Sequence, residues 1–204
     1  MTTIIYKKIR HGYARIDKEG HLQITIPLYK KWNKSFEESL IAKGEQLLKN
    51  YNKKTHIDPI QKDNILLFGE HIPLEQFHKQ YPRPKKQPTP CALHPVTQRI
   101  LKEILAEYAS PIIEEYSKKL WYKCKKLTIR KTSSKRGSCT YDQRLALNLD
   151  LVHLPTKYIK YVIIHEACHL KIKNHSKRFR ALVESLCPNY KETKKELRKF
   201  IIRT

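Results

Sequence analysis

Polar and apolar residues alternate through much of the first 77 residues, which is the pattern of strands with one buried face. Leu22, Ile24 and Ile26 show this alternation most clearly. Ser35-Phe36-Glu37-Glu38 has the form of a capping box and predicts a helix of about 15 residues. The expected strands are residues 3–6, a hairpin of residues 13–17 and 21–26, and a second hairpin of residues 64–68 and 71–74.

The apolar spacing changes to about 3.6 residues from residue 96 onward, which is the period of a helix. A long helix is expected as far as Leu120, and Pro111 either kinks it or starts a new one. Two strands at residues 127–130 and 144–149 then flank a polar loop at residues 132–139. Three helices follow, which begin near Pro155, Ser176 and Asn189. The last of them is expected to continue through Ile201. The expected fold class is therefore α+β, with N-terminal β-hairpins and a helix, then a long helix, a small sheet and C-terminal helices.

A proline-rich, basic segment separates these two parts of the chain. Residues 78–95 contain no acidic residue, and their repeated prolines favour an exposed, polyproline-like connector. The expected organisation is a strand-rich half over residues 1–77, this connector, and a core over residues 96–204.

Composition and charge limit the class of protein. The chain of 204 residues has 42 Lys and Arg against 19 Asp and Glu, and a formal net charge of +23 attracts polyanions such as nucleic acid. No apolar stretch has the length of a membrane span, and the N-terminus lacks the apolar region of a signal peptide. The five cysteines form no C-x-x-C pair, which favours reduced thiols. These features predict a cytoplasmic protein without a membrane partner.

The most informative motif lies at residues 165–169. His165-Glu166-Ala167-Cys168-His169 is the H-E-x-x-H pattern of zinc hydrolases, in which two histidines on consecutive helical turns face one metal. Glu166 lies about 100° further around the helix, so it can approach the open side of the metal without being a ligand. The motif predicts a Zn²⁺ site with His165 and His169 as ligands and Glu166 as the catalytic base.

A catalytic zinc ion requires a third protein ligand. His175 is the preferred candidate because residues 170–174 can end the helix and fold back, while Glu184 and Glu192 are acidic alternatives. Zinc held by neutral imidazoles lowers the pKa of its bound water to about 7, and a neighbouring carboxylate can pass the proton to a leaving amine. The predicted reaction is hydrolysis of an amide bond in a protein or peptide.

The chain resembles a known family in the same region. Residues 128–187 are similar to the YgjP-type zinc-dependent metallopeptidases, which are related to the SprT/Spartan and WLM proteases. The matching positions are Gly137-Ser138-Cys139, Leu147-Asn148, Pro155, residues 161–170, Asn174-His175-Ser176, Phe179 and Cys187-Pro188. The resemblance implies a minimal zincin-like core with His165, His169 and His175 as zinc ligands and Glu166 as base.

One position departs from the family pattern. The family usually has Arg-Trp-Gly-Ser-Cys where this chain has Lys135-Arg136-Gly137-Ser138-Cys139. An aromatic wall of the active site is therefore expected to be absent or to come from another residue, such as Trp121.

A basic stretch with two aromatic residues extends from Lys118 to Arg136 and contains nine Lys and Arg but no acid. Cations that hold phosphates and rings that stack on bases are the groups that bind single-stranded nucleic acid. The SprT/Spartan relatives act on proteins attached to DNA, so single-stranded or protein-crosslinked DNA is a candidate second partner. The alternative is a solvated, lysine-lined face with the two aromatic residues buried under it. The candidate contact residues are Lys118, Lys119, Trp121, Tyr122, Lys123, Lys125, Lys126, Lys135 and Arg136.

Three functions remain open from the sequence. The first is a zinc metallopeptidase, and the second is the same enzyme acting on nucleic-acid-associated proteins. The third is a basic nucleic-acid-binding module in which the zinc is structural. An open metal position beside Glu166 distinguishes the third function from the other two.

Overall fold

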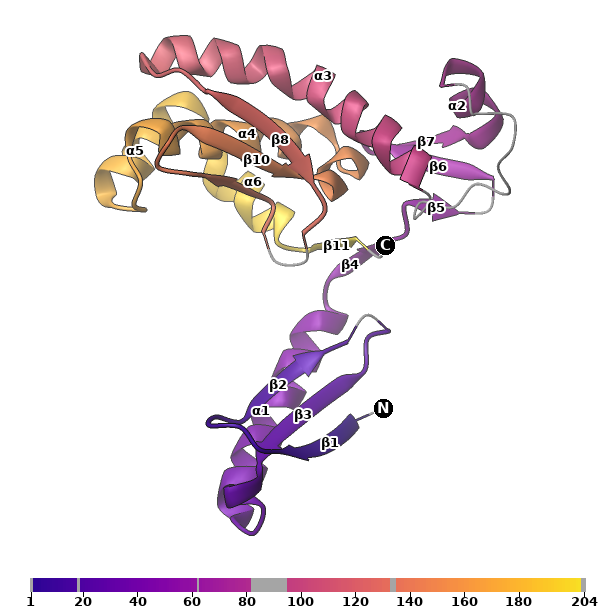
Figure 1. Ribbon diagram of the computed structural model, residues 1–204, viewed down its shortest axis with the longest axis vertical. Helices are drawn as coiled ribbons and strands as arrows, with labels where there is room; N and C mark the ends of the chain where they lie inside the picture. Colours follow the sequence, from indigo (N-terminus) through magenta and orange to yellow (C-terminus); the bar gives the residue numbers. More distant parts are fainter. Residues whose placement is uncertain (1, 18, 62, 82–94, 133–134, 203–204) are drawn as a thin grey trace. The chain divides into compact units, whose positions relative to one another are not determined.

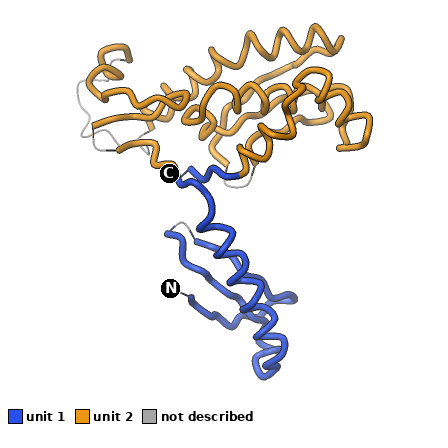
Figure 2. Tube along the Cα trace, turned by 180° about the vertical axis from the view of Figure 1, so that it is seen from behind, with its two compact units in different colours: residues 1–56, 199–203 blue, residues 57–198, 204 orange. Residues whose placement is uncertain are grey.

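The computed structural model describes residues 2–17, 19–61, 63–81, 95–132 and 135–202 (Figure 1). The chain forms two compact units (Figure 2). The first comprises residues 1–56 and 199–203, and the second comprises residues 57–198 with residue 204.

The first unit is a three-stranded sheet covered by one helix. Its elements are β1 (Thr2–Lys7), β2 (Tyr13–Ile16), β3 (Leu22–Pro27), η1 (Leu28–Lys30), α1 (Lys34–Asn52), β4 (Thr55–Ile57) and β11 (Phe200–Ile202). The central strand β3 pairs in parallel with β1 and antiparallel with β2. Leu22, Ile24, Ile26 and Leu40 of α1 form the core, so the alternation along β3 is the face that α1 buries.

Two sequence-based expectations for this unit are wrong in detail. Asn33, not Ser35, caps α1, because the Asn33 side chain accepts the Phe36 amide at 2.9 Å and the helix begins earlier, at Lys34. The last helix does not continue through Ile201. Residues 200–202 form β11, which pairs with β4, and the Thr55 amide donates to the Lys199 carbonyl at 2.7 Å.

The second unit contains the remaining helices and two further sheets. Its strands are β5 (Ile60–Gln61), β6 (Asn64–Leu67), β7 (Glu70–Pro73), β8 (Lys126–Arg130), β9 (Gly137–Cys139) and β10 (Arg144–Asn148). Its helices are α2 (Leu74–Gln80), α3 (Pro95–Leu120), η2 (Leu149–His153), α4 (Thr156–Lys171), α5 (Lys177–Leu186) and α6 (Tyr190–Leu197). The α+β class is confirmed.

The hairpin of β6 and β7 belongs to this second unit. Its turn contains Gly69 at φ 89°, a conformation that favours glycine. The His153 ring bonds the Leu66 carbonyl at 2.7 Å, and the Phe68 amide donates to the Val152 carbonyl at 2.8 Å. These bonds hold the hairpin to η2, so the two units divide at residue 57 and not in the connector expected over residues 78–95. Of that connector, residues 78–80 end α2 and residues 82–94 lie outside the described part of the chain.

The sheet beside the site has the order β8-β10-β9. Strand β10 runs parallel to β8 and antiparallel to β9, with Leu147 opposite Gly137. The strand β9 lies inside the segment expected to be a polar loop, because its short backbone run pairs with β10 despite the polar side chains. The long helix α3 is continuous through Pro111 and packs against α4 and β8.

Helix α4 is buried along most of its length between α3, the sheet, α5 and α6. Ile159, Ile163, Ala167 and Leu170 form a buried apolar stripe along this helix, since each of these residues is at most 3% exposed. The helix is therefore a rigid support for the residues on its other face. None of the helices that the structure describes has the length and apolar character to cross a bilayer.

Candidate metal centre

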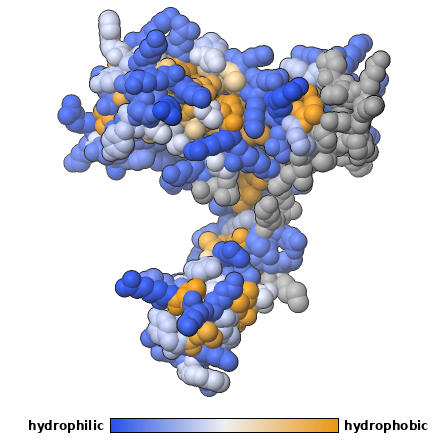
Figure 3. Space-filling model, in the orientation of Figure 1, coloured by the Kyte–Doolittle hydropathy of each residue, from blue (hydrophilic) through white to orange (hydrophobic). Residues whose placement is uncertain are grey.

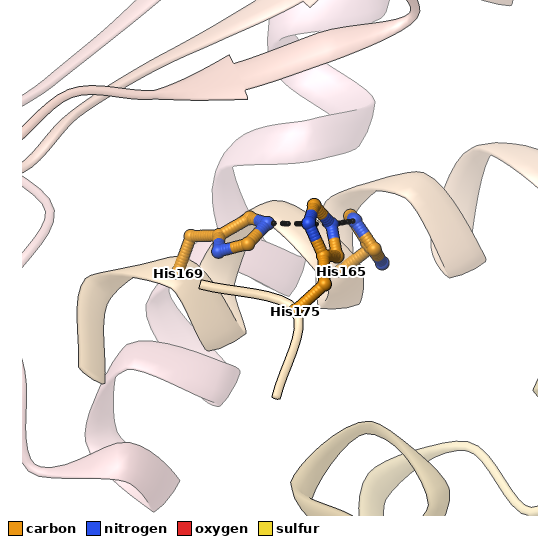
Figure 4. A group of neighbouring side chains, drawn as sticks. All are labelled: His165, His169 and His175. Carbon is orange, nitrogen blue, oxygen red and sulfur yellow. Dashed lines mark hydrogen bonds between the residues drawn. The ribbon is translucent and has the colours of Figure 1, made fainter. Parts of the chain in front are cut away.

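Three histidine rings meet at the C-terminal end of α4 (Figure 4). His165 and His169 project from consecutive turns of the helix, and His175 returns from the segment between α4 and α5. The Nε2 atom of His175 lies 3.1 Å from Nε2 of His165 and 3.3 Å from Nε2 of His169. The structure thus brings together the three residues that the sequence predicts as metal ligands.

The return of His175 follows from how the two helices end and begin. Helix α4 ends at Lys171, and α5 begins at Lys177 with the Ser176 side chain accepting the Phe179 amide at 3.4 Å. The buried Phe179 ring then packs against all three imidazoles, with ring centroids 5.1 Å from His165, 4.3 Å from His169 and 4.9 Å from His175. Phe179 is thus a buried residue of α5 that also packs directly against the histidine cluster.

The spacing of the three nitrogens fits a tetrahedral metal. Ligands about 2.05 Å from one ion at tetrahedral angles lie about 3.3 Å apart, which matches the separations from His175 Nε2 to the other two nitrogens. Three histidines supply the donor set that zinc prefers. Within the described residues, no further His, Cys, Asp or Glu joins this group, so one metal position is left for water or substrate.

The protonation of the histidines also suits a metal. The His169 ring bonds the Ile172 carbonyl at 2.9 Å through Nδ1. Because a carbonyl only accepts, Nδ1 carries the proton and Nε2 keeps its lone pair toward the cluster. Burial, together with the other two histidines and Lys194, lowers the pKa of His165 to about 4, so this ring is neutral near pH 7.

Glu166 is buried beside the cluster, with 7% of its surface exposed. Burial raises the pKa of its carboxyl to about 7, while Lys135 acts in the opposite direction. A carboxyl with that pKa can both take and give a proton near neutral pH. Gly137 of β9 lies directly against it, since a Cβ there would be 2.7 Å from Cγ of Glu166.

Two adjoining cavities open at the histidines, with volumes of about 510 and 470 Å³. Glu166, His169 and strand β9 line the first, and residues of α5 and α6 line the second. His165 and His175 line both cavities, so the metal position lies where the two meet. This is the geometry of a cleft that can hold an extended ligand on both sides of a central metal.

The chain matches the family model of the YgjP-like metallopeptidase domain over residues 10–200, which is nearly its whole length. It belongs to the YgjP-like metallopeptidase family. Two solved structures are similar to it, the metallopeptidase zymogens abylysin of Pyrococcus abyssi and jannalysin of Methanocaldococcus jannaschii. Each is 23% identical and covers 44% of this chain; the matches cover 90% and 92% of the abylysin and jannalysin chains, with TM-scores of 0.41 and 0.40. No curated protein matches the chain.

In this YgjP-like chain, the acidic alternatives for the third ligand lie elsewhere. Glu184 is exposed on α5 and accepts from Lys191 Nζ at 2.8 Å, and Glu192 is exposed on α6. Neither carboxylate belongs to the histidine group. The geometry therefore supports His175 as the third ligand.

The residues proposed for nucleic acid differ in their surroundings. Lys118 and Lys119 pair with Glu114 and Glu115, one helical turn earlier on α3, so part of their charge is neutralised. Trp121 and Tyr122 are exposed rather than buried, at 91% and 37%, whereas Lys135 and Arg136 line the first cavity. The remaining candidates, Lys123, Lys125 and Lys126, are exposed at the start of β8. Hydrophilic residues cover most of the face shown in Figure 3.

Arg136, the departure from the family pattern, has a structural contact of its own. Its Nη2 donates to the carbonyl of Leu197 at 2.9 Å, which joins the start of β9 to the end of α6. Burial lowers the pKa of Arg136, and the charge of Asp150 opposes that shift. Trp121 is not among the residues that line either cavity at the histidines, so it does not replace the missing aromatic wall there.

Proposed function

We propose that this metallopeptidase is a zinc-dependent endopeptidase, with His165, His169 and His175 as the metal ligands and Glu166 as the base. The observation that carries the proposal is the convergence of three Nε2 atoms within 4.8 Å of one another beside a buried carboxyl. When bound, zinc supplies a Lewis acid that polarises a carbonyl and lowers the pKa of a water to about 7. The open metal position argues against a structural zinc site, which is usually closed by four protein ligands.

Glu166 performs the proton transfers in this proposal. Its carboxylate accepts a proton from the attacking water and then donates it to the nitrogen of the leaving amine. Burial of this carboxyl disfavours its charged form and raises the pKa of the metal-free site to about 7, which favours uptake of the proton. The tight contact with Gly137 holds the carboxyl in one place, so that the transfer needs no reorganisation.

Strand β9 offers a place for the substrate backbone. It pairs with β10 on one side, and its residues Gly137, Ser138 and Cys139 line the first cavity together with Glu166. In the described part of the chain no strand pairs with its other edge. An extended peptide can add to a free strand edge through backbone hydrogen bonds, which suits an endopeptidase with little demand on sequence.

The decisive experiment compares Glu166→Gln with the wild-type protein. The variant should keep its zinc and lose casein cleavage by at least about 1,000-fold, because the amide cannot take up the proton. Zinc is measured by elemental mass spectrometry and cleavage by release of labelled peptides. A Glu166→Gln protein that cleaves casein at the wild-type rate would refute the proposal.

The same assay tests the narrower expectation that nucleic-acid-associated proteins are the substrates. The net charge of +23 motivates it. Single-stranded DNA should then accelerate cleavage of a DNA-bound protein, with a binding affinity that falls steeply with salt. Equal rates with and without DNA would exclude this role and leave the peptidase activity intact.

A further inference from the structure

Helix α6 presents a row of cations to the metal cleft. Lys191, Lys194, Lys195 and Arg198 all line the second cavity. The last three follow Lys191 by three, four and seven residues. Residues at this spacing lie on one face of a helix. Lys194 and Arg198 also line the first cavity, so these two side chains border the metal position from both sides.

The acidic residues of α6 are placed elsewhere. Glu196 accepts hydrogen bonds from Lys157 Nζ at 2.8 Å and from the Tyr158 hydroxyl at 3.0 Å, both at the start of α4. Glu192 is exposed and does not line either cavity at the histidines. The second cavity, as far as the structure describes its lining, contains no acidic residue at all.

Three of the other six cations that line the two cavities are engaged with protein groups. Lys191 pairs with Glu184, Arg136 donates to the Leu197 carbonyl, and Lys173 donates to the Thr140 carbonyl at 2.8 Å. Among the described residues, Lys194 and Arg198 have no carboxylate within ion-pair distance, and neither do Lys135, Arg180 and Lys195. Of these five, only Lys194 and Arg198 line both cavities. Positively charged side chains near the C-terminal end of a helix interact favourably with the helix dipole. This interaction does not explain why Lys194 and Arg198 face the cleft.

Two unpaired cations of like charge on one face repel each other, and an anion that binds between them removes this cost. A cleft lined by one sign of charge also concentrates ligands of the opposite sign. The cavity of about 470 Å³ is large enough for several amino-acid side chains beside the metal position.

We infer that Lys194 and Arg198 form a specificity subsite for a substrate carboxylate, an Asp or Glu side chain close to the bond that is cut. The inference rests on the proposed peptidase function, and it adds a substrate class to it. The two residues select the substrate and take no part in the proton transfers.

The test uses peptides of one fixed frame in which each position in turn carries Glu, Gln or Lys. The zinc-loaded wild-type protein should cut the best Glu peptide with a kcat/KM about tenfold above that of its Gln counterpart, and the Lys peptide should be poorer still. The preference should shrink as salt rises from 0.05 to about 0.5 M, because these cations are partly exposed to solvent. Equal kcat/KM for the Glu and Gln peptides at every position would overturn the inference.

Variants then assign the preference to these two side chains. Lys194→Gln with Arg198→Gln should bring the kcat/KM values of the Glu and Gln peptides within about twofold of each other. Lys194→Glu with Arg198→Glu should favour the Lys peptide. Lys123→Gln with Lys126→Gln removes the same charge from exposed positions outside the cleft and should leave the preference unchanged. A preference that persists in the Lys194→Gln, Arg198→Gln protein would overturn the assignment.

A binding measurement separates failure of the subsite from failure of the proposed function. The Glu166→Gln protein is titrated with labelled Glu and Gln peptides, with zinc present and after chelation, and fluorescence anisotropy gives the two affinities. Tighter binding of the Glu peptide in both states supports the subsite, because a carboxylate held only by the metal would lose its advantage on chelation. If the wild type cuts no peptide, the proposed function fails, and this titration still decides the subsite.

Discussion

Replacement of Gly137 by alanine should lower kcat about 100-fold without loss of zinc. The new Cβ would lie 2.7 Å from Cγ and 2.8 Å from Oε1 of Glu166, whereas ordinary contacts begin at 3.4 Å. The two groups must therefore separate by about 0.3 Å to reach the 3.0 Å limit and by about 0.7 Å to reach ordinary contact. Strand β9 cannot easily retreat because Gly137 is paired with Leu147, and Cγ is too near the α4 backbone to swing away freely. A misplacement of about 1 Å at a reacting group costs about 100-fold, or about 2.7 kcal/mol of transition-state stabilisation.

The assay measures kcat and KM on one fluorogenic peptide, together with zinc content and urea unfolding. Gly12→Ala is the matched control, because its Cβ would meet Leu40 Cδ2 at 2.9 Å in the first unit and does not touch Glu166. It should cost stability, about 1–3 kcal/mol for an overpacked site, and keep its kcat. Wild-type kcat in Gly137→Ala would show that this contact does not position Glu166. Loss of zinc would refute the reasoning as well, since it assigns the effect to the base and not to the histidines.

Two further results are expected. His175→Ala should weaken zinc binding by more than about 100-fold, as measured by competition with a chromogenic chelator, because loss of an outer-shell partner alone costs 10- to 100-fold; Glu184→Ala should bind zinc as the wild type does. Burial lowers the pKa of His153 from 6.5 to about 4, so the unfolded chain binds more protons between these values and stability is lost as the pH falls through this window. Measured by urea titration, the loss in free energy of unfolding approaches about 3 kcal/mol at pH 4. The His153→Gln protein has no titrating ring at this position and should not show this contribution to the loss.

The parts of the fold that local pattern controls could be predicted from the sequence. The alternation along residues 22–26 gave β3, and the apolar stripe through Ile159 and Ile163 gave the buried helix α4. The errors occurred where tertiary pairing overrides local pattern. Strand β9 has polar residues and exists because β10 offers it a partner, and residues 200–202 form a strand through pairing with β4, more than 140 residues earlier.

The candidate site also has features that the sequence predicts and features that depend on tertiary packing. The spacing of His165 and His169 is a helical turn, so the sequence alone places both on one face. Placement of His175 needed only a short return of the chain. The contacts of Gly137 with Glu166 and of Phe179 with the three rings depend on how distant elements pack, and no residue type in either segment indicates them.

The basic residues show most clearly the difference between what the sequence pattern indicates and what the tertiary structure determines. The run from Lys118 to Arg136 attracts notice because its cations are contiguous, yet two of them are paired with glutamates just before the run. The cations of α6 and its C-cap are interspersed with Glu192 and Glu196 in the sequence and form no contiguous run. They become a single face only because the helix turns Glu196 toward α4 and Lys194 toward the metal cleft. Arg136 reinforces this orientation, since its hydrogen bond to the Leu197 carbonyl fixes the end of the helix beside β9. The one departure from the family pattern thus supports the element that gives this cleft its charge.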